Sequence, residues 1–154
     1  MKKLNREGFT LIELLAIIVI LAIIMVVTIP TVLSSLGSAR RDTFDTSANT
    51  AADFIEKEYV AYKLNPSDTT LNSTLGTNLY SKTAGTSYEV TDNTVRGAMG
   101  LKGSNYSLVK VTIYSNGRAC VKLTPNTSAG DFKSLGSSAV ACSSACKSTD
   151  CTAA

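Results

Sequence analysis

The residue whose chemistry fits its surroundings least is Glu13. It is the one ionisable residue in the apolar stretch from Phe9 to Ile29. A helix over that stretch would be about 31 Å long, close to the thickness of the hydrocarbon core of a bilayer. Placing a carboxylate in hydrocarbon costs free energy, so such a group is expected to pair with a specific group that offsets its charge. Glu13 is therefore the first candidate functional residue, and the stretch around it is a candidate membrane span.

A short basic leader precedes the apolar stretch. Lys2, Lys3 and Arg6 all lie before Gly8. Because lysine and arginine flanking a span stay on the cytoplasmic side, the rest of the chain is expected to face outward.

The stretch Gly8-Phe9-Thr10-Leu11-Ile12-Glu13 resembles the class III signal of type IV pilins and pseudopilins. The resemblance implies that a prepilin peptidase cuts between Gly8 and Phe9 and N-methylates the new first residue. Pro30 also sits where the helices of this family commonly carry a proline. Cleavage would create the α-amino group of Phe9, which is positive at neutral pH. Glu13 is expected to pair with that amine, in its own chain or in the next subunit, and so to set the register of assembly, because a misplaced subunit would leave both charges unpaired.

A conventional secretory signal is the rival interpretation of this N-terminus. Its apolar region would span 7–15 residues and end near a small-x-small cleavage site. Leu14 to Val27 is an unbroken apolar run, and Gly37-Ser38-Ala39 could serve as the site. Glu13, the total length of the apolar stretch and the distance to the site all count against this alternative.

The four cysteines, Cys120, Cys142, Cys146 and Cys151, all lie on the expected outer side. An even number of cysteines on an exported chain favours disulfides. The preferred pairing is Cys120–Cys142, which would staple the C-terminal segment to the sheet, with Cys146–Cys151 closing a small loop. Three pairings are possible, and sequence alone does not choose among them. A zinc site with four cysteine ligands is the alternative, but the spacings lack a CxxC.

Residues for catalysis are scarce. The chain has no histidine, so it lacks the usual base of serine and cysteine nucleophile systems. Asp53, Glu56 and Glu58 are expected on a helix as solvated charges, and no glycine-rich phosphate loop follows a strand. Asp131 and Asp150 alone do not make the oxygen cluster of a calcium site, which weakens the resemblance to the major pseudopilins of type II secretion. We therefore expect neither an enzyme nor a cofactor or metal. The net charge of +3 gives no nucleic-acid footprint.

A long helix is expected to position the candidate residues. Beyond Pro30, apolar residues recur mostly three or four positions apart, which predicts an amphipathic continuation; they are Leu33, Leu36, Phe44, Ala48, Ala51, Ile55, Tyr59 and Tyr62. Pro30 and Gly37 predict a kink or local melting between the halves, and Asn65-Pro66 predicts the end of the helix. A helix over 9–64 would be about 84 Å long, whereas a compact chain of this size has a radius of gyration of about 15 Å. Its first half must therefore find lipid or other helices.

The remaining chain is expected to form a β-rich head. Residues 65–107 are predicted to form a surface connection with one or two short strands. Leu108 to Thr124 predicts a hairpin around Asn116-Gly117, with Val109, Val111 and Ile113 on one face of its first strand and Ala119, Val121 and Leu123 on one face of its second. A three-residue loop with a bulge is predicted to pair Ile113 with Val121 and Val111 with Leu123. Cys120 would then point away from the helix, and the C-terminal segment would cover that outer face.

The sequence thus predicts an α+β pilin fold in which a long N-terminal helix packs on a small antiparallel sheet. The expected organisation is a leader over 1–8, a transmembrane and polymerisation helix over 9–30, its amphipathic continuation over 31–64 and a globular head over 65–154 with a disulfide-bonded C-terminal region. The predicted function is a type IV pilus subunit for adhesion, twitching motility or DNA uptake. A pseudopilin of a type II secretion or competence system is the alternative, and a soluble secreted binding module is a further one. The expected partners are further copies of the chain, the prepilin peptidase, the assembly machinery and, before assembly, the cytoplasmic membrane, from which the subunit passes to a surface filament.

Overall fold

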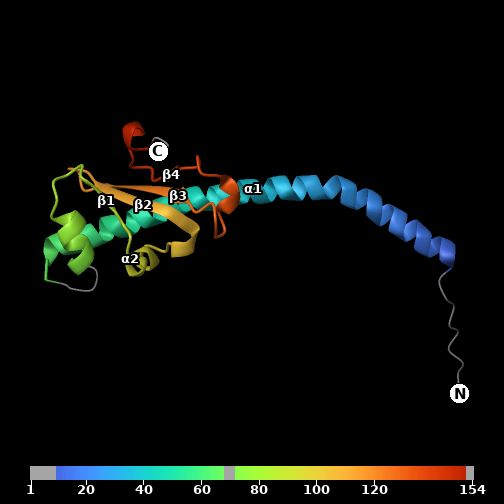
Figure 1. Cartoon of the computed structure of the whole chain (residues 1–154), viewed down its shortest axis with the longest axis horizontal. Helices are drawn as coiled ribbons and strands as arrows, with labels where there is room; N and C mark the ends of the chain where they lie inside the picture. The colour runs from blue at the N-terminus through green and yellow to red at the C-terminus, as the bar shows by residue number, and fades with distance from the viewer. Residues whose placement is uncertain (1–9, 68–71, 152–154) are drawn as a thin grey trace, which may run out of the picture. The chain divides into compact units, whose positions relative to one another are not determined.

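The computed structural model describes residues 10–67 and 72–151, in two compact units, Met1–Ser38 and Ala39–Ala154. One long helix, α1 (Leu11–Leu64), contributes to both units. Four strands, β1 (Ser87–Glu89), β2 (Tyr106–Ile113), β3 (Ala119–Pro125) and β4 (Ala141–Cys142), form an antiparallel sheet in the order β1-β2-β3-β4 (Figure 1). The α+β arrangement of a long N-terminal helix on a small antiparallel sheet is confirmed.

In the first unit, α1 is a single apolar helix. Pro30 lies inside it and the helix continues through that position, so the local melting expected near Pro30 does not occur. Hydroxyl groups bond to the carbonyl one turn back, Thr28 to Ile24 at 3.0 Å and Ser35 to Thr31 at 3.0 Å. These hydroxyls are satisfied within the helix and need no water, which suits an apolar environment.

In the second unit, the later part of α1 lies against the sheet. The helix ends at Leu64, directly before Asn65-Pro66, as expected. Phe44, Ala48, Ala51 and Ile55 are fully buried, and they are the middle of the predicted apolar stripe. The beginning of that stripe behaves differently, because Leu33 and Leu36 remain exposed.

The core of the head combines the buried face of α1 with one face of the sheet. It is continued by aromatic packing of Phe44 against Phe132 and Tyr106, with ring centroids 5.1 and 6.0 Å apart. The faces predicted for the hairpin are confirmed, since the sheet contributes Val109, Val111, Ile113, Ala119, Val121 and Leu123 to this core.

The predicted register of the hairpin is wrong by two residues. Val111 pairs with Val121, and Ile113 pairs with Ala119. The backbone N–H of Tyr114 donates to the carbonyl of Arg118 at 2.9 Å, which leaves a loop of Ser115, Asn116 and Gly117, and Gly117 has a φ of 79°. A shift of two residues keeps every side chain on its face, so the inward and outward assignment is correct although the partners are not.

The region 65–107 is more ordered than predicted. It contains the expected short strand β1, but also a π-helix, Asn72–Tyr80, and α2, Asn93–Ala98. Leu75, Leu79 and Tyr80 are buried. The interpretation as a plain surface connection is therefore wrong: a few apolar residues, widely spaced among Ser, Thr and Asn, are enough to anchor these turns on the core.

Candidate assembly helix and disulfide-bonded head

The start of α1 is closed by a reciprocal cap between Thr10 and Glu13. The Glu13 carboxylate oxygen Oε2 accepts from the Thr10 backbone N–H at 2.9 Å and from the Thr10 hydroxyl at 2.8 Å. The backbone N–H of Glu13 in turn lies 3.4 Å from the Thr10 hydroxyl and 3.1 Å from the Thr10 carbonyl. This is a capping box, whose signature is Thr or Ser followed three residues later by Glu. The signature is visible in Thr10-Leu11-Ile12-Glu13, and the sequence reasoning overlooked it.

The two residues expected at the processing site, Gly8 and Phe9, lie outside the described residues. The pairing of Glu13 with the Phe9 amine therefore stays a prediction. Glu13 itself is exposed, at the start of the helix.

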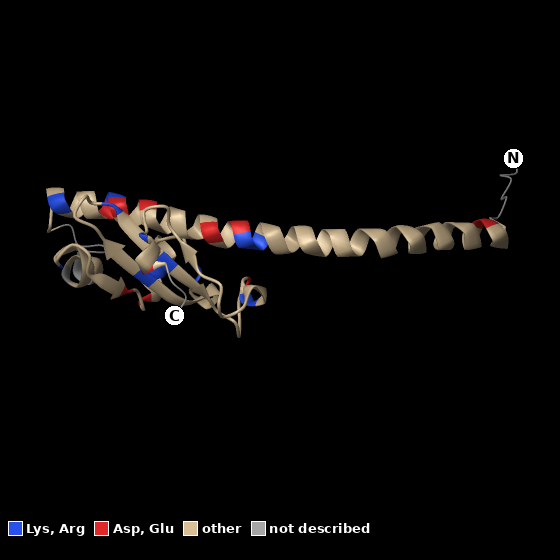
Figure 2. Ribbon diagram, turned by 90° about the horizontal axis from the view of Figure 1, so that it is seen from above, with Lys and Arg blue, Asp and Glu red and all other residues tan. Residues whose placement is uncertain are grey.

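The first unit presents an apolar surface that no other described residue of that unit covers. Figure 2 shows an acidic position at the start of α1 followed by a long stretch without charge. Large apolar side chains are half or more exposed along it, for example Ile12, Leu15, Ile18, Ile23 and Met25. The helix is long and apolar enough to cross a membrane by length and composition. An apolar surface of this extent marks contact with lipid or with other protein.

In the head, polar side chains of α1 anchor the loops around it. Oε1 of Glu56 accepts from the backbone N–H of Ala119 at 2.9 Å and from the guanidinium of Arg118 at 3.0 Å. Asn49 Oδ1 accepts from the backbone N–H of Ser144 at 2.8 Å. Glu56 was expected to be a solvated charge, and that is wrong: it ties α1 to the start of β3. Such a tie depends on the tertiary fold, so the helical pattern alone gave no signal for it.

The predicted disulfide pairing is wrong. The bonds are Cys120–Cys146 and Cys142–Cys151. Because β4 pairs with β3 so that Cys142 lies opposite Lys122, Cys142 is offset from Cys120 by two residues along the strand. All four cysteines are nevertheless in disulfides, as the even count and the exported position predicted.

Ser143 explains how Cys146 reaches Cys120. Its hydroxyl accepts from the backbone N–H of Val121 at 3.0 Å and donates to the carbonyl of Ala119 at 3.1 Å. The chain then turns, with the Cys146 N–H donating to the Ser143 carbonyl at 3.0 Å. The turn brings the α-carbons of Cys146 and Cys120 to 4.5 Å. The C-terminal segment therefore covers the outer face over Cys120, which is 2% exposed, as predicted.

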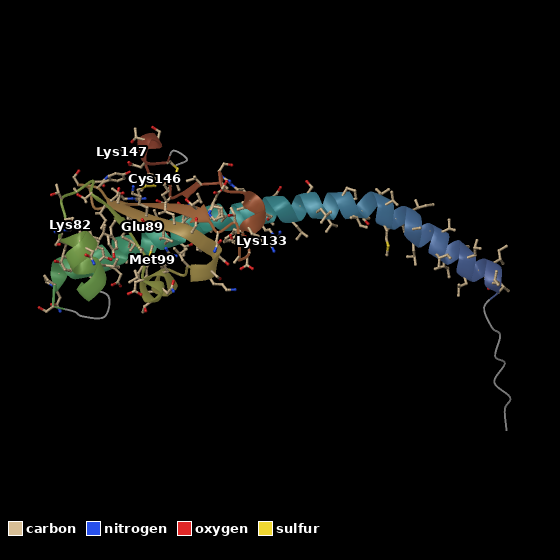
Figure 3. All side chains as sticks on the ribbon, in the orientation of Figure 1. Lys82, Glu89, Met99, Lys133, Cys146 and Lys147 are labelled. Carbon is tan, nitrogen blue, oxygen red and sulfur yellow. A yellow bond between two sulfur atoms is a disulfide. The ribbon has the colours of Figure 1, made fainter. Side chains whose placement is uncertain are left out.

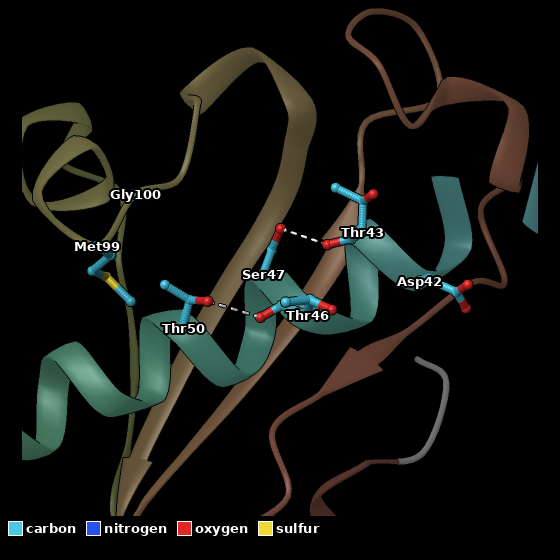
Figure 4. Close-up of a pocket in the computed structure, with 7 residues that line it drawn as sticks. All are labelled: Asp42, Thr43, Thr46, Ser47, Thr50, Met99 and Gly100. Atoms are coloured by element: carbon cyan, nitrogen blue, oxygen red, sulfur yellow. Dashed lines mark hydrogen bonds between the residues drawn. The ribbon is translucent and has the colours of Figure 1, made fainter. Parts of the chain in front are cut away.

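A groove of about 340 Å³ runs along α1 in the head beside Met99 and Gly100 (Figure 4). Hydroxyl side chains line it, but they bond back along their own helix: Ser47 donates to the Thr43 carbonyl at 2.8 Å, and Thr50 donates to the Thr46 carbonyl at 3.1 Å. No nucleophile and base meet among these lining residues.

Three tyrosines of the head have a raised pKa. Burial is the main cause for Tyr80, with the nearby charge of Glu58 adding to it. Burial also raises the pKa of Tyr106 and of Tyr114, and the hydrogen bond from Tyr114 to the Asp150 carboxylate raises the latter further. These groups keep their protons well into the alkaline range, which suits a structural role. Among residues 10–67 and 72–151, no three metal-ligating side chains gather.

Comparison with known families bears on the first unit. A family model described as the prokaryotic N-terminal methylation motif matches residues 3–29. The chain carries the class III signal of type IV pilins and pseudopilins. The matched segment includes Gly8, Phe9 and Glu13 and ends just before Pro30. No curated protein and no solved structure gives a significant match to the chain. The motif therefore supports a type IV pilin or pseudopilin, implies processing by a prepilin peptidase, and fits a membrane-anchored precursor.

Proposed function

We propose that this chain is a structural subunit of a type IV pilus, a surface filament for adhesion, twitching motility or DNA uptake. The observation that carries the proposal is the coincidence of the methylation motif at residues 3–29 with a helix whose apolar side chains are uncovered in its own unit. A subunit whose chemistry is to pack helices needs no catalytic group, so we propose no enzymatic activity for it.

Assembly begins with the removal of the leader over 1–8. In this proposal the cut after Gly8 frees the Phe9 amine, and Glu13 of one subunit binds the amine of a neighbour once both leave the membrane. The charge pair fixes the axial step, because any other step places a lone charge among apolar side chains.

Packing of the helices supplies the driving force. The exposed apolar side chains from Leu11 to Ile29 would form the filament core, and Pro30 would lie at its edge. Leu33 and Leu36 extend the apolar surface beyond the membrane span, and both are at least half exposed. The head, closed by two disulfides, would form the exterior.

The test is direct observation of filaments. Gold-conjugated antibodies raised against the head should label surface filaments in electron micrographs of cells that express the native chain. Gly8→Val, which places a branched side chain at the cut, should abolish both processing and labelled filaments. Gly37→Ala is the matched control, because a Cβ at Gly37 meets nothing within 4 Å. Filaments that never carry the label, although the chain is processed and present in the envelope, would contradict the pilus assignment and favour a pseudopilin.

A further inference from the structure

The groove beside α1 in the head offers a partner more carbon than its polar lining suggests. The hydroxyls of Thr43, Ser47 and Thr50 each donate to the carbonyl one turn back, at 2.8, 2.8 and 3.1 Å. Met99, labelled in Figure 3 and Figure 4, adds its apolar side chain to the lining. Because the hydroxyls are already bonded, a partner between Thr43 and Thr50 meets mainly the carbon atoms of these side chains.

Leu33 and Leu36 are apolar side chains that a bilayer does not cover. They are 64% and 50% exposed. The apolar stretch from Phe9 to Ile29 already matches the thickness of the hydrocarbon core, so both leucines lie beyond it. An apolar surface outside the bilayer marks contact with protein.

The leucines and the groove fit each other in size and in chemistry. An apolar cavity of about 150 Å³ holds a benzene ring, so a groove of about 340 Å³ has room for two branched aliphatic side chains. Leu33 and Leu36 are three residues apart and therefore lie on the same face of α1. The flexible thioether of Met99 adapts to the shape of such a pair.

We propose that the groove of one subunit receives Leu33 and Leu36 of a neighbouring copy of the chain. The inference rests on the proposed function, because it needs copies of the chain to assemble. Within one chain the leucines and most of the groove lining belong to a single helix, in which only residues three or four apart meet. The leucines that fill the groove therefore come from a second copy.

This contact explains how the chain can polymerise rather than pair. Each copy carries the leucines on one segment and the groove on another, so two copies in contact still have one free pair of leucines and one free groove. A contact between two different surfaces of the same chain generates a ring or an open helical filament. The groove thus adds a second contact to the helix packing of the first unit.

Two cysteines introduced into the full chain test the contact, Leu36→Cys on the apolar side and Thr46→Cys in the groove. The four native cysteines are in disulfides, so a short bis-maleimide joins only the introduced thiols. Filaments sheared from cells should give a ladder of covalent multimers, and each single variant should lose the ladder. Leu36→Cys with Asp53→Cys is the matched control, because Asp53 is exposed on α1 outside the groove lining, and it should give no ladder.

Filling the groove gives an independent measurement. Thr46 is exposed, so Thr46→Trp leaves the core unchanged and occupies the space of the leucines. It should raise the subunit concentration needed for assembly about tenfold or more, whereas Asp53→Trp should assemble as the native chain does. Intact disulfides, shown by mass after alkylation, establish that each variant is folded.

The outcomes separate this contact from the pilus assignment. Labelled filaments without the ladder would overturn the contact and leave the pilus assignment in place. If the native chain gives no labelled filaments, the pilus assignment fails, and cross-linking of the envelope fraction then decides: a ladder supports the contact and its absence overturns it. Loss of filaments in Thr46→Trp without a ladder in the cysteine pair would show that a different molecule fills the groove, which also overturns the proposal.

Discussion

Glu13 has two separable tasks in this account, and one substitution separates them. Its carboxylate caps α1 by accepting from the backbone N–H and the hydroxyl of Thr10, and its charge is proposed to pair with the Phe9 amine of a neighbouring subunit. Glu13→Gln keeps an oxygen acceptor for the cap but removes the charge. Thr10→Ala removes the capping hydroxyl and leaves the charge in place.

The two variants should differ widely in the concentration of subunit needed for assembly. Loss of a capping side chain costs about 1 kcal/mol. Thr10→Ala should therefore raise the subunit concentration needed for assembly, the assembly threshold, about fivefold. In Glu13→Gln, the Phe9 ammonium would be left alone among apolar helices, and removing one partner of a buried pair is strongly destabilising. The threshold should then rise on the order of a hundredfold or more.

The assay measures filaments sheared from cells and the total subunit in the envelope, for both variants and the native chain. Mass analysis of the subunit first shows that each variant is cut and methylated normally, so that only assembly is compared. Native filament yield from Glu13→Gln would refute the charge-pair argument. Equal loss in Thr10→Ala and Glu13→Gln would show that the cap, not the charge, is what assembly needs.

Three further predictions concern the head. The buried Tyr80 hydroxyl has no hydrogen-bond partner among the described residues, and an unsatisfied buried polar group destabilises the fold. Tyr80→Phe should therefore raise the free energy of unfolding by about 1 kcal/mol, measured by thermal denaturation. A lower free energy of unfolding would contradict this. Because the raised pKa values of Tyr80, Tyr106 and Tyr114 mean that the folded state holds these protons more tightly, stability should be full below about pH 10 and fall as the pH rises above it. The absorbance of tyrosinate, followed as the pH is raised, measures this ionisation. If all six tyrosines ionised together near pH 10, the prediction would be wrong. Replacing Cys120 and Cys146 together by serine should cost about 2–4 kcal/mol in denaturant unfolding yet leave filaments intact, and filaments that fall apart would show that the cysteines join subunits.

The sequence predicted the parts of the fold that depend on repeated local patterns. The apolar residues of α1 from Phe44 to Ile55 recur at helical spacing, and alternation in Val109, Val111 and Ile113 gave the buried face of β2. Both were confirmed. Leu33 and Leu36 belong to the same helical pattern but stay exposed. Periodicity predicts which face of a helix is apolar, but it does not predict whether the same chain or another molecule packs against that face.

The rest depended on contacts that no local pattern encodes. The disulfide pairing follows from the offset of β4 against β3 and from the turn after Ser143, and four cysteines alone do not determine either. Glu56 bonds a strand distant in sequence, so its role was invisible in the helix. The Thr10–Glu13 cap is different, because its signature is a local pattern that can be recognised in the sequence. It was overlooked because only the charge of Glu13 was considered.

The most direct test of the central claim is the intact mass and N-terminal sequence of the protein isolated from its native cell envelope. The account predicts a chain that begins at Phe9 and is heavier than the bare sequence by one methyl group. A chain that begins downstream of Ala39, or one that still carries Met1, would contradict prepilin processing and with it the assignment as a filament subunit.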